Sequence, residues 1–142
     1  MRVLLDTHAV LWALRSAQRL PAWLIKLLET TATEVVISAV TPWELGLKYH
    51  LGKLPEAEPV VVNWEACLTR LQAESLPITH RYGLVAAGLD WPHRDPFDRV
   101  LAAQAMVEGL PLVSADRIFD TVPNVDRWWD APPPGNEATG AR

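Results

Sequence analysis

The sequence predicts an α/β fold in which a central, mostly parallel sheet is covered by helices. Short apolar runs alternate with helical patterns along the chain, which is the element order of a parallel sheet with crossover helices. Three of the runs are β-branched or leucine-rich and lack strict alternation, as expected for strands covered on both faces. The chain has 142 residues, of which 49% are hydrophobic, and this suits one domain with a sizeable core.

The predicted strands begin with the buried runs Val3–Leu5, Val35–Ile37 and Leu112–Val113. A fourth run, Leu76–Ile78, contains Pro77, which cannot donate to a strand ladder, so this strand is expected near an edge of the sheet. Apolar residues at helical spacing predict six helices between these strands: Ala9–Arg15, Ala22–Thr30, Trp43–His50, Val60–Ala73, Tyr82–Leu89 and Phe97–Glu108. The last of these helices is mostly apolar, so it is expected to be well covered.

The domain is expected to span residues 1–130. Residues 131–142 contain no periodic apolar residues, which predicts a disordered tail. Two adjacent tryptophans, Trp128 and Trp129, precede this tail. They either close the core or mark a surface for a partner.

Composition excludes several classes of function. No apolar stretch approaches the roughly 18–20 residues of a membrane span, and the N-terminal residues lack the apolar run of a signal peptide. Cys67 is the only cysteine, which excludes an internal disulfide and a thiolate zinc site. We therefore expect a cytoplasmic protein that does not bind membranes. The net charge of −4 argues against a broadly basic nucleic-acid binder but allows a local basic rim.

Acidic residues follow the predicted strands at one edge of the sheet. Asp6 closes the first strand, and Asp116 follows the strand that ends near Val113. Ligand sites of open parallel sheets lie outside the carboxyl ends of the strands, where both acids are expected. Glu44 follows the second strand in Thr41-Pro42-Trp43-Glu44, which is typical of an N-cap, a proline at the first helical position and an acid at the third.

Asp98 stands in a second copy of this pattern, Asp95-Pro96-Phe97-Asp98. Its helix precedes the Leu112 strand across the tight turn Gly109-Leu110-Pro111 and must run antiparallel to that strand. The start of the helix therefore lies at the strand's carboxyl end. Topology alone brings Asp98, together with Asp95, toward the same edge as the other three acids.

Each acid also has a purely structural interpretation. Glu44 and Asp98 could be capping-box acids that accept from backbone N–H groups. Asp116 could be a turn residue. Asp6 gains no capping role unless a helix starts at once at Thr7 or His8. Like charges that crowd in one cleft repel each other, so the predicted convergence calls for a bound cation or for protonated acids, and we favour the cation.

The chemistry of the predicted ligands limits the metal. The cluster contains only carboxylates, which suits Mg²⁺ or Mn²⁺ better than zinc or copper. Such an ion can activate a bound water and hold the attacked phosphate, as in metal-dependent nucleases. Phosphodiester hydrolysis is therefore the expected reaction.

The motifs resemble those of the PIN-domain ribonucleases, and within them the VapC-type toxins of bacterial toxin–antitoxin pairs. The matching segments occur in family order over nearly the whole chain: Leu4–Leu14, Ile37–Leu54, His93–Ala105 and Leu110–Asp116. The resemblance implies a three-layer α/β/α domain that binds one or two divalent ions and cuts RNA. It also implies a VapB-type antitoxin that covers the site, and frequent formation of a homodimer.

On this resemblance Asp6, Glu44, Asp98 and Asp116 match the four family acids and are the expected metal ligands and catalytic residues. Asp95 is either a fifth, outer acid or only the N-cap of its helix. Ser114 stands where a threonine is common in the family. Thr7 and Ser114 are expected to orient carboxylates or water from a second layer around the metal.

Arg94, Arg99 and Arg117 flank these acids and are the expected phosphate contacts, with Lys48 further out. Each could instead be a solvated surface residue, and Arg99 could pair with a site carboxylate. An antitoxin is expected to lay an apolar segment into a groove between helices, to which Ala9–Arg15, Trp43–His50 or Val60–Ala73 could contribute.

Two other functions remain open at this point. One is a catalytically silent PIN-like module that binds RNA or protein, and the other is a housekeeping RNA-processing nuclease without an antitoxin. Loss of a metal ligand would favour the first, but all four acids are present. A neighbouring reading frame that encodes an antitoxin would distinguish a toxin from the second.

Overall fold

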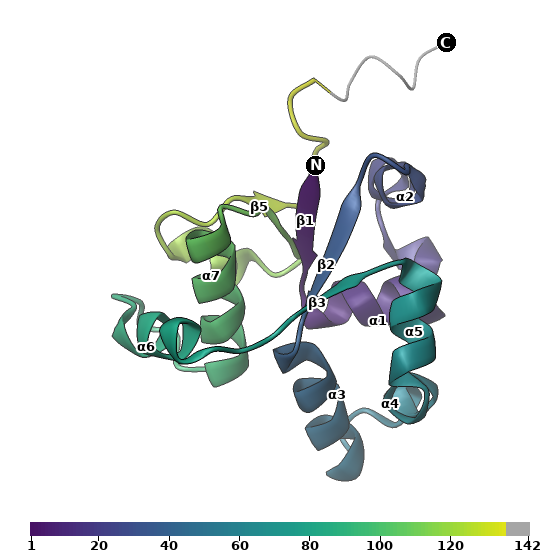
Figure 1. Ribbon diagram of the computed structural model, residues 1–142, viewed down its shortest axis with the longest axis horizontal. Coiled ribbons are helices and arrows are strands. Elements are labelled where there is room, and N and C mark those ends of the chain that lie inside the picture. The colour runs from purple at the N-terminus through teal and green to yellow at the C-terminus, as the bar shows by residue number, and fades with distance from the viewer. Residues whose placement is uncertain (136–142) are drawn as a thin grey trace.

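A five-stranded, wholly parallel sheet forms the centre of the computed structural model, which describes residues 1–135 (Figure 1). The strand order is β3-β2-β1-β4-β5, and every neighbouring pair is parallel. The strands are β1 (Arg2–Leu5), β2 (Glu34–Ser38), β3 (Glu74–Leu76), β4 (Leu112–Val113) and β5 (Arg127–Trp128). The predicted parallel α/β fold is confirmed.

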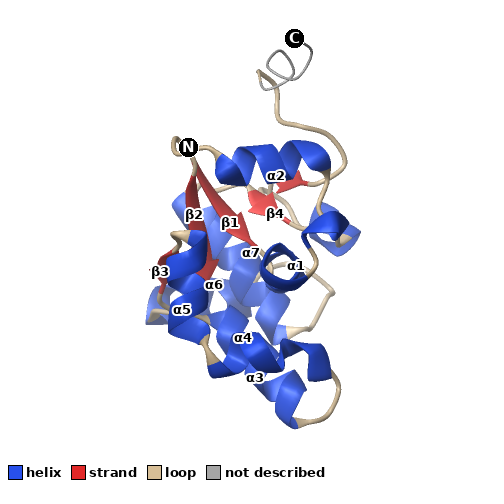
Figure 2. Cartoon of the chain, turned by 90° about the vertical axis from the view of Figure 1, so that its right-hand side faces the viewer, coloured by secondary structure: helices blue, strands red, loops and turns tan. Residues whose placement is uncertain are grey.

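Helices cover both faces of this sheet. They are α1 (Thr7–Arg15), α2 (Ala22–Glu29), α3 (Val40–His50), α4 (Glu58–Val62), α5 (Trp64–Leu71), α6 (His80–Gly88) and α7 (Pro96–Glu108), together with the short 3₁₀ turns η1 (Ala17–Arg19), η2 (Pro55–Ala57) and η3 (Arg117–Thr121). In Figure 1, α6 and α7 lie on one side of the strands, and α1, α2 and α5 lie on the other. Figure 2 shows the same division from the side, with α1 and α5 in front of the sheet and α7 behind it.

The alternation of side chains along β1 explains the two halves of the core. Val3 and Leu5 point into a cluster with α1 and α2, whereas Leu4 points into a second cluster with α7. The side chains of these three residues are fully buried. A strand that is apolar on both faces can be stable only between two helical layers, so this pattern produces the predicted three-layer α/β/α architecture.

Several element boundaries differ from the prediction. The helix expected over Val60–Ala73 is two helices, since Asn63 leaves the helical conformation and its side-chain amide donates to the Pro59 carbonyl. The strand predicted over Leu76–Ile78 corresponds to β3, which ends at Leu76, directly before Pro77. It lies at an edge of the sheet, as predicted. β5 has only two residues and was not predicted from the sequence.

The starts of α1 and α3 were also placed too late. α1 begins at Thr7, and α3 begins at Val40, whose amide donates to the Ser38 hydroxyl at 3.0 Å. Thr41 and Pro42 therefore lie inside α3, and the interpretation of Thr41 as its N-cap was wrong. Proline is tolerated throughout the first turn of a helix, because the N–H groups there have no partner in the helix.

The C-terminal part of the described chain packs on the core. Trp128 and Trp129 are half-buried against the cluster that contains Leu5, and the Trp23 indole donates to the Trp129 carbonyl at 3.2 Å. Closing the core is thus the role that their contacts favour. The expected tail begins within the described residues, which form no helix or strand from 131 to 135, and residues 136–142 lie outside them. Over residues 1–135 no helix is both long and apolar enough to cross a membrane.

Candidate active site

Asp6 lies at the carboxyl end of the central strand and is 6% exposed. One carboxylate oxygen accepts from the Ala9 amide at 2.8 Å and caps α1, and the other accepts from the Ser114 hydroxyl. Because α1 begins at Thr7 and not at the predicted Ala9, Asp6 is the N-cap of this helix. It also contacts Ser114 across the sheet. The Asp6 pKa is raised to about 6, chiefly by burial and also by the negative charges of Glu44 and Asp116, while the hydrogen bonds from Ser114 and Ala9 lower it.

Glu44 is a buried acid in the middle of α3, not a capping acid at its start. It is 4% exposed and lies beyond the first helical turn, so the capping-box interpretation does not hold. One carboxylate oxygen accepts from the Thr7 hydroxyl at 2.7 Å, and the other pairs with the Lys48 ammonium one turn later. The Thr41 hydroxyl lies 3.4 Å from that of Thr7. No pattern in the sequence predicts that these threonines face each other, because they are 34 positions apart.

Asp98 lies in the first turn of α7, where the predicted helix start is confirmed. Asp95 is the N-cap and accepts from the amides of Phe97 and Asp98 at 2.8 and 3.1 Å, which favours the capping role of Asp95 over that of an outer acid. The Asp98 carboxylate contacts the His93 ring nitrogen at 2.6 Å. The Asp98 pKa is raised to about 6, chiefly by burial and also by the charges of Asp95 and Glu44, while the contact with His93 lowers it.

Asp116 lies on the exposed turn that follows β4. Its carboxylate accepts from the Ile118 amide at 3.0 Å and so has the turn role that the sequence allowed. Its own amide donates to the Ser114 hydroxyl at 3.0 Å, and that hydroxyl donates to Asp6. Ser114 therefore connects the Asp116 turn to the central acid, as expected for a residue that orients carboxylates.

The acids lie close enough to influence one another's ionisation. Glu44 acts on the pKa of both Asp6 and Asp98, and Asp116 acts on that of Asp6. Over residues 1–135, however, no three His, Cys, Asp or Glu side chains form a ready-made ligand cluster. The all-carboxylate donor set fits Mg²⁺ or Mn²⁺, because Mg²⁺ is commonly bound by one or two carboxylates and keeps several waters.

The predicted phosphate contacts are placed differently from one another. The Arg99 guanidinium is turned inward and donates to the carbonyls of Ala86, Leu89, Trp91 and His93 at 2.8–2.9 Å. This arrangement favours a structural role, since it fixes the loop before α7. Arg94 is exposed, the Arg117 side chain is 77% exposed, and Lys48 reaches the site through Glu44.

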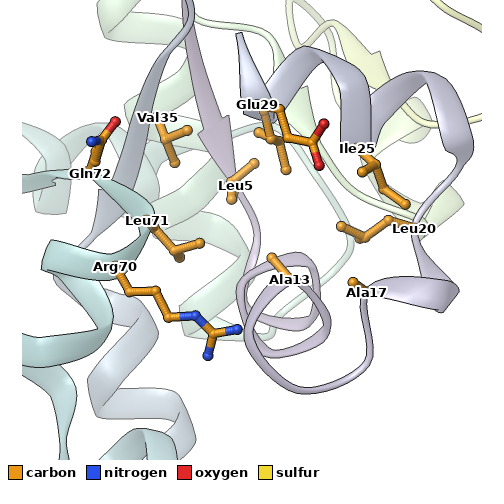
Figure 3. A pocket seen from close by; sticks show the side chains of 11 residues that line it. Leu5, Ala13, Ala17, Leu20, Ile25, Glu29, Val35, Arg70, Leu71 and Gln72 are labelled. Atoms are coloured by element: carbon orange, nitrogen blue, oxygen red, sulfur yellow. The ribbon is translucent and has the colours of Figure 1, made fainter. Parts of the chain in front are cut away.

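A separate cavity of about 400 Å³ lies between α1, α2 and α5, on the face of the sheet opposite α7 (Figure 3). Apolar side chains line most of it, among them Leu5, Leu20, Ile25, Val35 and Leu71. Glu29 and Arg70 supply its charged groups. The predicted groove helices α1 and α5 contribute to this cavity, whereas α3 does not.

Fold and site together define a class of protein: a parallel α/β domain with a carboxylate site at the carboxyl ends of its strands. The chain belongs to the PIN-domain family, whose model matches residues 3–125. Nucleases of this family generally use divalent metal ions. No curated protein sequence matches the chain.

Three solved structures are similar to this chain in fold. VapBC2 from Rickettsia felis, bound to a DNA fragment from its promoter, is 22% identical with a TM-score of 0.69, covering 92% of this chain and 100% of that one. DNA-bound VapBC from Salmonella typhimurium is 20% identical with a TM-score of 0.65, covering 90% and 97%. FitAcB from Neisseria gonorrhoeae is 24% identical with a TM-score of 0.60, covering 90% and 96%.

Proposed function

We propose that this chain is a divalent-metal-dependent endoribonuclease and the VapC-type toxin of a type II toxin–antitoxin pair. The observation that carries the proposal is the set of four acids at the carboxyl edge of a PIN-domain sheet. Two of them, Asp6 and Asp98, have a pKa raised to about 6 by burial and by neighbouring carboxylates. Crowded acids of this kind are typical of functional sites and are relieved by a bound cation.

Each group of the site has a proposed role. Asp6, Glu44, Asp98 and Asp116 would hold Mg²⁺ or Mn²⁺ directly or through water, and the bound ion would supply the acidity for an activated water and the positive charge for the attacked phosphate. Ser114 and Thr7 orient the Asp6 and Glu44 carboxylates through the hydrogen bonds described above.

The remaining polar groups act on the substrate. Lys48, Arg94 and Arg117 bind RNA phosphates, the two arginines from the exposed rim. Lys48 binds a phosphate beside the acids, because its ammonium pairs with Glu44. Arg99, whose donors are used by backbone carbonyls, is left out of this role. A cytoplasmic location stays a prediction.

Cleavage of a mixed cellular RNA pool tests the proposal. Purified, antitoxin-free protein is expected to cut RNA with Mn²⁺ or Mg²⁺ and not with EDTA, leaving 5′-phosphate ends. Asp6→Asn and Asp98→Asn should abolish cutting, while Asp90→Asn, at an exposed position, is the matched control. A folded wild-type protein that binds Mn²⁺ but leaves every RNA intact would favour the silent binding module instead.

The cavity between α1, α2 and α5 is the proposed docking place of the antitoxin. Its apolar lining suits an apolar segment, and Glu29 and Arg70 can fix the direction of that segment by charge. Ile25→Glu should abolish co-purification with the product of the neighbouring short reading frame. Val62→Glu, on the 68%-exposed Val62 of α4, should leave it intact. Equal capture by both variants would place the partner elsewhere.

A homodimer is proposed through the outer face of α3. Trp43, Leu47 and Leu51 repeat at helical spacing and are 57%, 43% and 59% exposed, which is unusual for large apolar side chains. Light scattering after size exclusion should give twice the monomer mass for the wild type and the monomer mass for Leu47→Asp. A monomeric wild type at all concentrations would refute this assignment.

A further inference from the structure

All three guanidinium nitrogens of Arg127 form hydrogen bonds near the acidic site, although no step described so far involves this residue. The side chain is 5% exposed. Its Nη1 donates to the Ser114 carbonyl at 3.0 Å, and Nε and Nη2 donate to the two carboxylate oxygens of Asp120 at 2.8 and 3.1 Å. Nη2 also donates to Asp130 at 2.6 Å. These contacts hold the Asp120 pKa below its usual range.

The position of Arg127 follows from the pairing of the last strand. β5 runs parallel to β4 with Arg127 beside Leu112, and the Ser114 amide donates to the Trp128 carbonyl. The guanidinium thereby reaches two points of the segment between the two strands. It binds Ser114 at the start of this segment and Asp120, inside η3, at its middle.

Asp116 lies between those two anchoring points. Of the four acids proposed as metal ligands it is the only exposed one, and no strand or α-helix carries it. Its place depends on the Ser114 hydroxyl and on the Ile118 amide of η3. Arg127 holds the main chain on both sides of these contacts, so it controls the segment on which Asp116 depends.

We propose that Arg127 is a positioning residue of the acidic site: by clamping Ser114 to Asp120 it keeps the Asp116 carboxylate in place and so sets the affinity for the divalent ion. The inference rests on the proposed function. Arg127 lies beyond residues 3–125, the part of the chain that the PIN-domain model matches, so the family likeness does not assign it a role.

A second effect of the clamp concerns charge. Arg127 neutralises Asp120 and Asp130, whose side chains are 50% and 54% exposed. Without the guanidinium Asp120 would be unpaired beside the Asp116 turn, and Asp130 would keep only its 3.6 Å contact with Arg117. Repulsion between these carboxylates and Asp116 would then loosen the turn.

The dissociation constant for Mn²⁺, measured on the RNA-free full chain by calorimetry, tests the proposal without relying on cleavage. Arg127→Ala is expected to weaken Mn²⁺ binding by roughly tenfold or more, the usual effect of removing a residue that supports a metal ligand. The Mn²⁺ affinity of Arg127→Lys should lie between those of the wild type and Arg127→Ala, since an ammonium cannot replace the planar guanidinium. Arg2→Ala is the matched control. Arg2 pairs with Glu34 on β2 and Glu74 on β3, which form the other half of the sheet.

A double-mutant cycle separates positioning from general loosening of the fold. If Arg127 acts through Asp116, Arg127→Ala should cause no further loss once Asp116→Asn is present. Circular dichroism at the same temperature establishes that each variant is folded. Should Arg127→Ala not fold, Asp120→Asn takes its place in the cycle, since it removes one arm of the clamp and keeps Arg127 bound to Ser114 and Asp130.

The outcomes are distinct. Wild-type affinity in the Arg127 variants, or an equal loss with and without Asp116, would overturn the positioning role while leaving the nuclease proposal intact. A wild-type chain that binds no Mn²⁺ would overturn both. A loss that appears only when Asp116 is present supports the proposal.

Discussion

Replacing Asp6 by asparagine should stabilise the metal-free protein at neutral pH while it destroys the proposed activity. The Asp6 carboxylate is almost completely buried, and its pKa of about 6 lies well above the usual 3.8. The folded chain therefore keeps the Asp6 proton at pH values where the unfolded chain has released it. The stability that this proton contributes is present below about pH 4 and is lost as the pH rises through about 6.

The size of the effect follows from the difference in pKa. A tenfold change in ionisation is worth about 1.4 kcal/mol, so a rise from 3.8 to about 6 makes the ionised Asp6 cost about 3 kcal/mol above pH 7. Asparagine keeps an oxygen for the Ala9 amide, but it exchanges the charged acceptor of the Ser114 hydroxyl for a neutral group, at a cost of about 1 kcal/mol. Asp6→Asn should therefore raise the free energy of unfolding by about 2 kcal/mol at pH 8.

Urea unfolding in EDTA at several pH values between 4.5 and 8.5 measures this difference directly. The advantage of the variant should grow as the pH rises through 6 and then level off. Adding Mn²⁺ should reverse the order, since a ligand at about 100 times its dissociation constant stabilises the wild type by about 2.7 kcal/mol and the variant by far less. An Asp6→Asn variant that is less stable than the wild type at every pH in EDTA would refute the reasoning, because the buried charge would then carry no cost.

Three further predictions concern the frame around the site. Arg99→Lys should lower the free energy of unfolding by about 3 kcal/mol in urea, because one ammonium cannot satisfy four carbonyls; Arg94→Lys, at an exposed position, is the control and should change nothing. Thr7→Val should cost about 1–3 kcal/mol by leaving the buried Glu44 without its hydroxyl donor, and recovery in Thr7→Ser would attribute the loss to that bond. Gly109→Ala should cost about 1 kcal/mol, since its φ of +64° is strained for alanine although nothing lies within 4 Å of the added carbon; an unchanged melting temperature would contradict this.

The features that sequence could predict are those set by neighbouring residues. The apolar runs of β1, β2 and β4 and the sequence Asp95-Pro96-Phe97-Asp98 each carry their own signal, and all appear in the structure as strands or as a helix start. The carboxyl ends of parallel strands share one edge, so these local assignments were enough to predict acids along that edge of the sheet. Neither step needed any knowledge of side-chain contacts.

The features that sequence could not predict depend on side-chain contacts that no residue pattern encodes. Arg99 lies beside two acids in the chain, which suggested a phosphate contact, yet its guanidinium turns to carbonyls on the loop before α7. Glu44 stands at the third position after a plausible N-cap, yet the Ser38 hydroxyl starts the helix earlier and leaves Glu44 buried in its middle. In both cases a hydrogen bond to a nearby part of the backbone overrides the role that the pattern suggested.

The same contacts explain how a chain with crowded acids can fold before any ion binds. Asp6 accepts from Ser114 and Ala9, Glu44 pairs with Lys48, and Asp98 contacts His93, so each buried carboxylate has a donor from the chain itself. These donors offset part of the cost of burial but not all of it, because the pKa values of Asp6 and Asp98 remain raised. A bound divalent cation can relieve this remaining cost of burial. Cation binding is therefore expected to increase the free energy of unfolding.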